Sequence, residues 1–469
     1  MKTLLLNLPH RTKVIRRYMC SYNAPNIMFP PLELLALGGI AKRWKNGEVK
    51  LIDAIAEDLS LEDVEHYIGA FAPDVIVSIS GFECFEEDME AISHIKKNWP
   101  TTPFILFGHY ATQFWEEIME KVPVDFILLG EPDLKFAEVY EHLENGKTLD
   151  ETDGVVYRKE GAAISNGNNH RIPDPNQLPI PAYELLKGGL YFEPFMDRPF
   201  GMIQTARGCP YQCNYCVKSF GTKLTTLRPE RIIEELVFMK QHLGIRSVRF
   251  IDDTFTAIPK NVLRLCELMI GSNLNLTWSC LTRPDTISRE LLTAMKAAGC
   301  KRIFFGVESG SQRILDRYNK GLDVESTLPN LQACQELGIE TLGWFMVGQP
   351  GETREDLARS ISYAKQARFN YVLVSKFIPY PGTPIFSEIR DQINFSILPY
   401  KNEFKDKTKE KEYHGWEKEF FLRYYFRPAY VFNNFKRFII SPKEFFDNVK
   451  NLSKYLVLPD KSNKRKDFA

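Results

Sequence analysis

The chain has 469 residues, with 60 Lys plus Arg against 60 Asp plus Glu and 44% hydrophobic residues. The balanced charge excludes a general electrostatic attraction to nucleic acid or to an anionic membrane, and we expect no nucleic-acid partner. The length is sufficient for two or three domains, each with its own core.

The chain begins MKTLLLNLPHRTK, where the apolar run is only a few residues long. Such a short run predicts neither a signal peptide nor a membrane-spanning helix, so we expect a cytoplasmic protein. Thiols stay reduced in the cytoplasm, and clustered cysteines there bind metal or do chemistry more often than they form disulfides.

Residues 1–145 alternate short apolar runs with amphipathic stretches, which is typical of repeated strand–helix units. The expected strands cover 3–8, 49–54, 74–80, 103–108 and 125–130, and the expected helices cover 32–44, 61–71, 86–99 and 112–121. Strands this uniformly apolar are covered on both faces, which indicates a parallel, doubly wound, Rossmann-like (flavodoxin-like) sheet.

Doubly wound sheets bind ligands in the crevice at the carboxyl ends of their strands. Small and polar residues lie at or just after these ends in the first domain. Any single one could simply turn the chain, but their shared position favours a binding site. The candidates are Asp53, Ser78, Ser80, Gly81, Gly108, His109, Gly130 and Glu131.

Prolines accumulate over 146–195, which we interpret as a linker with a short hairpin around 154–165. A second strand–helix series then fills 196–390. Its expected strands are 201–207, 247–253, 276–281, 302–309, 340–348 and 371–379, and its expected helices include 229–244, 288–299 and 355–367. Six such units with right-handed crossovers predict a partial (β/α)6 barrel with its active site at the carboxyl ends of the strands.

The segment ARGCPYQCNYC follows the first barrel strand and places Cys209, Cys213 and Cys216 on one loop. Three thiolates can hold three irons of a 4Fe-4S cluster and leave the fourth iron open. Zinc is the less favoured alternative, because a structural zinc site usually closes with a fourth protein ligand and no Cys or His lies close by in sequence. The other cysteines stand singly in apolar or helical contexts, typical of small buried hydrophobes: Cys20, Cys84, Cys266, Cys280, Cys300 and Cys334.

The three-cysteine loop at the start of a partial barrel, preceded by a doubly wound domain, resembles the radical S-adenosylmethionine (SAM) enzymes that carry a cobalamin-binding domain. The resemblance covers roughly residues 1–390, and FIDDTF, GVESGS and PYPGTP strengthen it. It implies that the open iron chelates SAM and that one electron cleaves SAM to a 5'-deoxyadenosyl radical. The radical then abstracts a hydrogen atom from a small-molecule substrate, and the electron comes from an external donor such as flavodoxin or ferredoxin.

The resemblance also implies roles around the cluster. Tyr215 matches an aromatic position that packs against the adenine of SAM, with ordinary loop packing as the alternative. Glu308 suits hydrogen bonds to the ribose hydroxyls, although a helix-capping or surface carboxylate would fit the same sequence. Asp252 and Asp253 end the second barrel strand, where a buried carboxylate could orient substrate or SAM and where one of the two could cap the next helix.

Two further residues complete this set. Arg283 follows the third barrel strand and could pair with the SAM carboxylate, and a surface-turn arginine is equally consistent with its place before a proline. Gly348 would let backbone approach the adenine edge, or would serve a plain strand-to-helix turn.

The cobalamin resemblance rests on weaker motifs. Residues 1–145 have no Asp-x-His-x-x-Gly segment whose histidine could ligate cobalt, and radical SAM relatives generally lack it too. Where many of those relatives read Gly-Gly-Pro-His-Ala-Thr, this chain reads FGHYAT, with Phe107, His109 and Tyr110 departing from the pattern. Gly130 and Glu131 still match. The alternative is a domain that binds nothing or serves as a docking surface.

Residues 391–469 form a C-terminal extension that we expect to be helical. It begins with a charged stretch and continues with aromatic residues mixed with Lys and Arg at roughly helical spacing. One interpretation has it pack on the barrel and complete the substrate pocket. The other makes it a basic amphipathic surface for peripheral membrane contact or for a lipid substrate.

The sequence therefore predicts a cobalamin-dependent radical SAM enzyme that methylates an unactivated carbon of a hydrophobic substrate. A radical cyclase or oxidase resembling the anaerobic magnesium-protoporphyrin ester cyclases is the nearest alternative. A non-catalytic protein that binds the cluster and a corrinoid is the alternative from another class.

Overall fold

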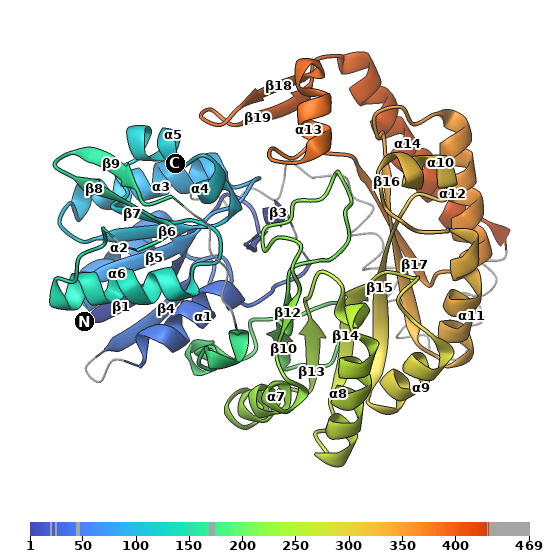
Figure 1. The fold of residues 1–469 in the computed structure, drawn as a ribbon, viewed down its shortest axis with the longest axis horizontal. Helices are drawn as coiled ribbons and strands as arrows, with labels where there is room; N and C mark the ends of the chain where they lie inside the picture. Colours follow the sequence, from blue (N-terminus) through green and yellow to red (C-terminus); the bar gives the residue numbers. More distant parts are fainter. Residues whose placement is uncertain are drawn as a thin grey trace.

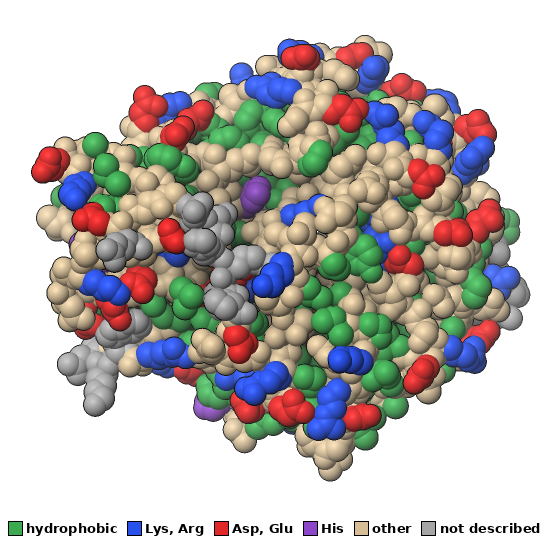
Figure 2. All heavy atoms as spheres, in the orientation of Figure 1, with side chains coloured by type: hydrophobic (Ala, Val, Ile, Leu, Met, Phe, Trp, Pro, Cys, Tyr) green, Lys and Arg blue, Asp and Glu red, His purple; other side chains and the backbone are tan. Residues whose placement is uncertain are grey.

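A computed structural model describes residues 1–18, 21–23, 26–43, 47–150, 152–167, 174–428 and 430. Two α/β units follow each other along the chain, and Figure 1 shows them side by side with the green cysteine loop between them. Acidic and basic side chains are interspersed over the face drawn in Figure 2.

The first unit is a seven-stranded sheet of order β4-β1-β5-β6-β7-β8-β9. Its strands are β1 (Lys2–Asn7), β4 (Glu48–Asp53), β5 (Val75–Ile79), β6 (Phe104–Phe107), β7 (Phe126–Leu128), β8 (Val155–Lys159) and β9 (Ala162–Ser165). The first five strands in this order are parallel. The hairpin that we expected in the linker is β8–β9, and it extends this sheet in antiparallel fashion.

Helices cover both faces of the first sheet, as uniformly apolar strands require. One face carries α1 (Leu32–Ala41) and α6 (Asp133–Asn145), and the other carries α2 (Leu61–Phe71), α3 (Phe85–Asn98) and α5 (Trp115–Lys121). A short α4 (His109–Gln113) precedes α5, so the single helix expected over 112–121 is broken at Phe114. The ring of Phe114 packs against Tyr110 with 5.2 Å between centroids. Since α1 and α3 lie on opposite faces, the chain changes face between β1 and β5.

The second unit is a six-stranded parallel sheet of order β10-β13-β14-β15-β16-β17, which confirms the predicted partial barrel. Its strands are β10 (Phe200–Ile203), β13 (Ser247–Phe250), β14 (Thr277–Thr282), β15 (Cys300–Glu308), β16 (Glu340–Val347) and β17 (Tyr371–Lys376). The outer helices are α7 (Pro229–Leu243), α8 (Pro259–Gly271), α9 (Arg289–Ala297), α10 (Gln312–Arg317), α11 (Leu328–Glu336) and α12 (Arg354–Ala367). A capping box between Thr353 and Asp356 begins α12.

The inner face of the barrel is layered. At the amino ends of the strands, Glu193 from the linker forms an ion pair with Arg249 and accepts a hydrogen bond from Ser279 at 2.9 Å. Above this polar floor lies an apolar layer of buried and partly buried side chains. Its members are Phe304, Leu342, Tyr371, Leu281, Trp344 and Leu373. The linker therefore closes the amino end of the barrel and leaves an apolar interior above it.

The described part of the C-terminal extension packs on the barrel, and its role in completing the substrate pocket stays a prediction. A short helix, α13 (Pro384–Glu388), precedes it. The extension itself begins with the β18 (Ile393–Ser396)–β19 (Lys401–Phe404) hairpin, where we expected helix, and continues with α14 (Lys407–Tyr425). Tyr425 of α14 accepts the backbone N–H of Val372 at 2.8 Å and donates to the carbonyl of Val372 at 2.9 Å. Glu417 accepts the N–H of Lys376 at 2.5 Å, so α14 covers the free edge of β17.

The basic, aromatic stretch covers 420–457, and only 420–428 and 430 of it are among the described residues. Across the part of the chain that the structure describes, every helix is too short or too polar to cross a membrane. Short 3-10 helices occur at Pro175–Gln177, Tyr183–Leu185, Phe255–Ala257, Glu325–Thr327 and Arg390–Gln392.

Candidate active site

The three cysteines lie on the loop between β11 (Ala206–Arg207) and β12 (Thr225–Thr226). The N–H of Cys209 donates to the Gly221 carbonyl at 3.2 Å and closes the loop. Burial raises the pKa of the Cys216 thiol, and the charges of Asp253, Cys213 and Cys209 raise it further. The three thiols therefore share one electrostatic environment.

These residues fit a cluster with an open iron. Iron takes thiolate rather than thiol, so binding must remove the proton that burial holds on Cys216. Within the described ranges, no set of three or more His, Cys, Asp and Glu side chains is arranged to hold a single metal ion. Three thiols on one loop are the donor set that a 4Fe-4S cluster with one open iron requires.

A carboxylate and an ammonium lie beside the cysteines. Glu308 ends β15 after a register shift, with φ of +70°, a conformation that a non-glycine residue rarely adopts. Its Oε1 is 3.2 Å from Nζ of Lys320, which is 6% exposed. A Cβ on Gly306 would lie 2.9 Å from the same Oε1, so this glycine makes room for the folded-back carboxylate.

Lys320 is a site residue that sequence reasoning missed. Its charge lowers the pKa of Cys216 against the effect of burial, which places the ammonium near the thiols. Little in the sequence indicated this role, because Lys320 follows α10 and does not stand at a strand end. An ammonium there can pair with a carboxylate of a ligand held at the open iron.

Arg283 lies close to the cysteine loop, but its donors are occupied. It makes two hydrogen bonds to Asp285, at 2.9 and 2.7 Å, and its guanidinium lies 3.7 Å from the ring centroid of Tyr211. It also donates to the carbonyls of Lys320 at 2.7 Å and Gly321 at 3.0 Å. Arg283 therefore holds the backbone of Lys320 in place and packs against Tyr211 of the cysteine loop.

The two aspartates after β13 differ. Asp252 is 1% exposed and accepts the N–H groups of Thr205 at 2.6 Å and Ala206 at 2.9 Å, together with the Thr205 hydroxyl. These bonds turn the chain away from the barrel sheet, which is why the strand expected over 201–207 ends at Ile203. Asp253 is half-buried and acts electrostatically on Cys216.

We expect Asp252→Ala to lower the melting temperature by about 5–10 °C, because three hydrogen bonds of about 1 kcal/mol each are lost. Burial raises the pKa of Asp252 from 3.8 to about 7. The folded protein thus holds a proton that the unfolded chain releases, and this residue's contribution to stability falls as pH rises from about 4 to about 7. Asp252→Asn keeps the acceptor without the charge, so its melting temperature relative to wild type should rise over the same interval. A difference that does not change with pH would contradict this assignment.

The two predicted adenine contacts, Tyr215 and Gly348, have different surroundings. Tyr215 packs edge-on against Tyr318, with 6.1 Å between ring centroids, and the charge of Glu308 acts on its hydroxyl. Gly348 has φ of +78°, and a Cβ there would lie 2.5 Å from the ring of Tyr413 in α14. The C-terminal extension therefore covers one side of the Gly348 turn.

At the first sheet, the predicted residues form one continuous edge. Asp53 accepts hydrogen bonds from Asn7 at 2.7 Å and from Tyr191 of the linker at 3.2 Å. Ser80 donates to Asp88 at 2.7 Å. The hydroxyl of Ser78 is fully buried without a partner. The carbonyl of Gly81 accepts a weak 3.8 Å contact from Cys84.

The other half of this edge lies against the cysteine loop. Gly108 has φ of +127°, and a Cβ there would lie 2.3 Å from the Ser80 carbonyl. His109 Nδ1 is 3.4 Å from the hydroxyl of Ser219, and burial lowers the pKa of His109 to about 4, so the imidazole is neutral. The N–H of Gly130 donates to Thr112 at 2.9 Å.

An ion-pair group joins the two units. Arg207, two residues before Cys209, pairs with Glu131 at 3.2 Å and with Asp133 at 2.6 Å. Glu131 and Asp133 are almost fully buried, so the pair is shielded from solvent. The carboxyl edge of the first sheet and the cysteine loop are therefore held together.

Four cysteines that stand far apart in the sequence meet behind the barrel. Burial raises the pKa of Cys300, and Cys280, Cys334 and Cys266 add to the effect. All four are at most 2% exposed, and Cys84 is buried separately. Protonated thiols in such surroundings pack as small hydrophobes. Cys20 lies outside the described residues.

Comparison with known proteins matches residues 203–364 to the Radical SAM superfamily. The chain is 32% identical over 387 residues to an uncharacterized methyltransferase of Pyrococcus horikoshii, and the alignment covers 82% of each chain. It is 24% identical over 374 residues to the anaerobic magnesium-protoporphyrin IX monomethyl ester cyclase of Rubrivivax gelatinosus, over 78% of this chain and 67% of the cyclase.

Among solved structures, the fold is similar to that of TsrM, a radical S-adenosylmethionine methyltransferase of Kitasatospora setae with cobalamin and a [4Fe-4S] cluster bound. The TM-score is 0.68 at 18% identity, with 83% of this chain and 75% of TsrM covered. Three cysteines on one loop at the mouth of a six-stranded parallel barrel, together with these matches, show that the chain belongs to the Radical SAM superfamily.

Proposed function

We propose that this protein is a cobalamin-dependent radical SAM enzyme that methylates an unactivated carbon of a hydrophobic substrate. The observation that carries the proposal is the contact between the carboxyl edge of the first sheet and the cysteine loop, made by Arg207 with Glu131 and Asp133. A cofactor held on that edge would face a ligand held at the loop. The names of the Pyrococcus methyltransferase and of TsrM support methyl transfer.

In this proposal residues 196–390 bind the cluster and SAM, residues 1–145 bind cobalamin, 146–195 connect them, and 391–469 cover the barrel. The cluster, when bound, supplies the electron that cleaves SAM to a 5'-deoxyadenosyl radical. Cys209, Cys213 and Cys216 hold the irons, Lys320 pairs with the SAM carboxylate, and Glu308 accepts from its ribose hydroxyls or amino group. Tyr215 packs beside the adenine. As a radical SAM enzyme it needs a reductant, and we propose flavodoxin or ferredoxin.

The first-sheet edge fits a corrinoid. Cobalamin, when bound, carries the methyl group and donates it. The buried, unpartnered hydroxyl of Ser78 offers one hydrogen bond that the protein itself does not use. The edge also presents His109 as a neutral ring rather than a charge, which suits a large, mostly uncharged macrocycle.

The barrel interior supports a hydrophobic substrate. Leu281, Trp344 and Leu373 are only partly buried on its inner face, between the ion-paired floor and the cysteine loop. Partly exposed apolar side chains inside a barrel gain free energy when an apolar ligand covers them.

A radical cyclase or oxidase is the second candidate, and the similarity to the Rubrivivax cyclase favours it. A protein that binds both cofactors without turnover is the third. Methyl-deuterated SAM separates them. We expect the label in the product, with release of both S-adenosylhomocysteine and 5'-deoxyadenosine. An unlabelled cyclised or oxidised product with 5'-deoxyadenosine alone would replace methyl transfer by cyclase chemistry, and no reductant-dependent 5'-deoxyadenosine would leave only binding.

Cobalt should receive no protein nitrogen in this site. His109 lies on the carboxyl edge of the first sheet, and its ring contacts Ser219, Gln113 and the Pro381 carbonyl. We expect the electron paramagnetic resonance spectrum of cob(II)alamin-loaded protein to show no nitrogen superhyperfine splitting. Clear splitting that disappears in His109→Ala would identify His109 as a cobalt ligand and contradict this expectation.

A further inference from the structure

The segment between β1 and α1 crosses the carboxyl edge of the first sheet. It contains the short hairpin of β2 (Val14–Arg16) and β3 (Ser21–Asn23), and Figure 1 shows β3 between the first sheet and the barrel. Arg16 and Tyr18 are both buried. They contact different parts of the edge and differ in how easily they can leave it.

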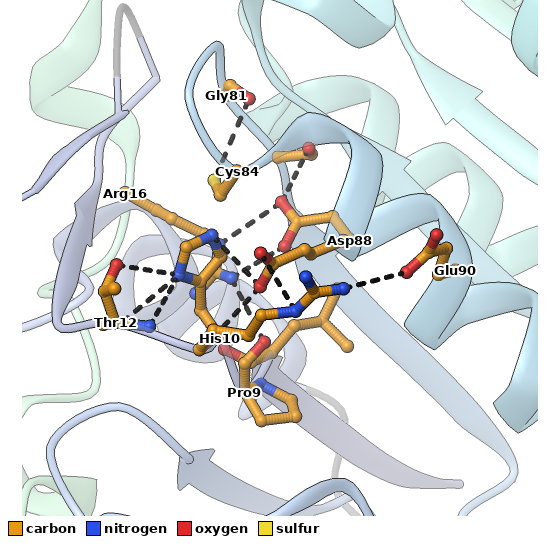
Figure 3. Close-up of polar contacts among 12 residues, drawn as sticks. Pro9, His10, Thr12, Arg16, Gly81, Cys84, Asp88 and Glu90 are labelled. Carbon is orange, nitrogen blue, oxygen red and sulfur yellow. Dashed lines mark hydrogen bonds and ion pairs between the residues drawn. The ribbon is translucent and has the colours of Figure 1, made fainter. Parts of the chain in front are cut away.

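Arg16 is an anchor. Its guanidinium donates to Asp88 in the first turn of α3 at 2.6 Å. It also donates to the carbonyl of Leu8 at 2.7 Å and to Asn7 at 3.0 Å, at the end of β1. Figure 3 shows Arg16 and Asp88 facing each other, with His10 and Cys84 beside them. Both charged side chains are fully buried, so separating them would leave two unpaired charges at a high cost in free energy.

Tyr18 is an uncharged plug two residues later. Its ring stacks on Phe220 of the cysteine loop with 4.8 Å between centroids, and on Phe107 of β6 with 6.5 Å. Its hydroxyl donates to the carbonyl of Gly130 and lies 3.3 Å from the hydroxyl of Thr112. Tyr18 therefore fills a slot with two aromatic walls and two hydrogen-bonding groups at its end.

The slot coincides with the predicted corrinoid edge. The carbonyl of Tyr18 accepts the N–H of His109 at 3.1 Å, and Gly130 follows β7 on the same edge. A cavity of about 70 Å³ opens beside Tyr18, lined also by Leu32, Arg207 and Phe220. Burial raises the pKa of Tyr18, so the phenol stays neutral and leaves no charge unpaired when it moves.

We propose that Tyr18 is a placeholder, and that the slot between Phe107 and Phe220 takes the planar aromatic base of the cobalamin nucleotide tail when Tyr18 swings out. This inference rests on the proposed cobalamin cofactor. A benzimidazole ring matches the slot, because it is planar, aromatic and uncharged and can stack on the same two walls. Arg16 stays in place, so the movement begins after it.

If Tyr18 fills the slot in most molecules, only the fraction with an open slot can bind the nucleotide base. The apparent affinity for cobalamin is then the intrinsic affinity multiplied by that open fraction. Tyr18→Ala should therefore bind hydroxocobalamin about tenfold more tightly than wild type. Tyr18→Phe loses the two contacts of the hydroxyl but keeps the ring, and it should bind about threefold more tightly. Both variants should bind cobinamide, which lacks the nucleotide tail, with wild-type affinity. Equilibrium binding followed by corrinoid absorbance measures all of these values.

The control is Tyr140→Phe, which removes the hydroxyl of an equally buried tyrosine in α6 and should change neither affinity. Hydrogen–deuterium exchange supplies a readout without catalysis: hydroxocobalamin should speed exchange around Tyr18 and leave Arg16 protected. Three results would overturn the placeholder while the corrinoid proposal stands. They are an equal gain in affinity for both corrinoids, unchanged or weaker cobalamin binding in Tyr18→Ala and Tyr18→Phe, and slower exchange around Tyr18 when hydroxocobalamin binds. Absence of binding of either corrinoid to wild type and variants would overturn both.

Discussion

Replacing Cys209, Cys213 or Cys216 by alanine should abolish the charge-transfer absorbance of the anaerobically reconstituted protein and all reductive cleavage of SAM. In the proposed site each thiolate holds one iron, and no other described cysteine lies on the loop to replace it. The measurements are the visible absorbance, the iron content and the 5'-deoxyadenosine formed with dithionite. Retention of both absorbance and cleavage in any one variant would remove that cysteine from the ligand set.

Cys280→Ser is the matched control for these variants. Cys280 is fully buried and lies with Cys300, Cys334 and Cys266 behind the barrel, away from the cysteine loop. We expect its iron content and SAM cleavage to equal those of wild type, although the polar hydroxyl costs stability in an apolar site. Loss of iron at an unchanged fold would mean that Cys280 helps to hold the cluster and that the ligands are misassigned.

Lys320→Met should weaken SAM binding by about 30-fold or more while leaving the cluster in place. Loss of one partner from a buried charge pair costs at least about 2 kcal/mol, and here it removes the cation that we propose as the partner of the SAM carboxylate. The variant keeps the long apolar stem of lysine, so packing around Glu308 changes little. Titration of SAM into the reconstituted protein measures the affinity, and cluster absorbance confirms the occupied loop.

Lys96→Met provides the comparison for Lys320→Met. Lys96 lies in the first unit, is equally buried and pairs with Asp125 at 2.8 Å, so its loss costs stability without touching the barrel. It should bind SAM with wild-type affinity. If Lys320→Met also binds SAM normally, the ammonium serves only to hold Glu308, and the SAM carboxylate is bound by another group.

Local patterns predicted the elements and the cysteine loop, because strand periodicity and CxxxCxxC spacing are written in adjacent residues. The assignment of individual partners depends on contacts between distant segments. Arg283 is close to the cysteine loop as its position after a strand suggested, yet Asp285 and two carbonyls occupy it, and Lys320, 37 residues later, takes the place beside Glu308. No sequence pattern indicates that Lys320, and not Arg283, lies beside Glu308.

The same limit applies to residues that entered no motif. Tyr18 stands in an irregular insert, and only the folded edge shows that it reaches Gly130 and Phe220. Cys266, Cys280, Cys300 and Cys334 look solitary in sequence because two helices and two strands supply them. By contrast, the position of Gly108 could be predicted from the sequence, since a tight backbone turn at a strand end requires a residue without a side chain.

The cover that α14 places on β17 also bears on how the protein behaves at high concentration. An open barrel has two edge strands, and an uncovered edge recruits strands from other molecules into intermolecular sheets. Tyr425 and Glu417 occupy the backbone groups of β17 that such recruitment would use. A chain shortened before Lys407 would expose them, so its failure to remain in solution would reflect aggregation through this strand and not loss of the catalytic centre.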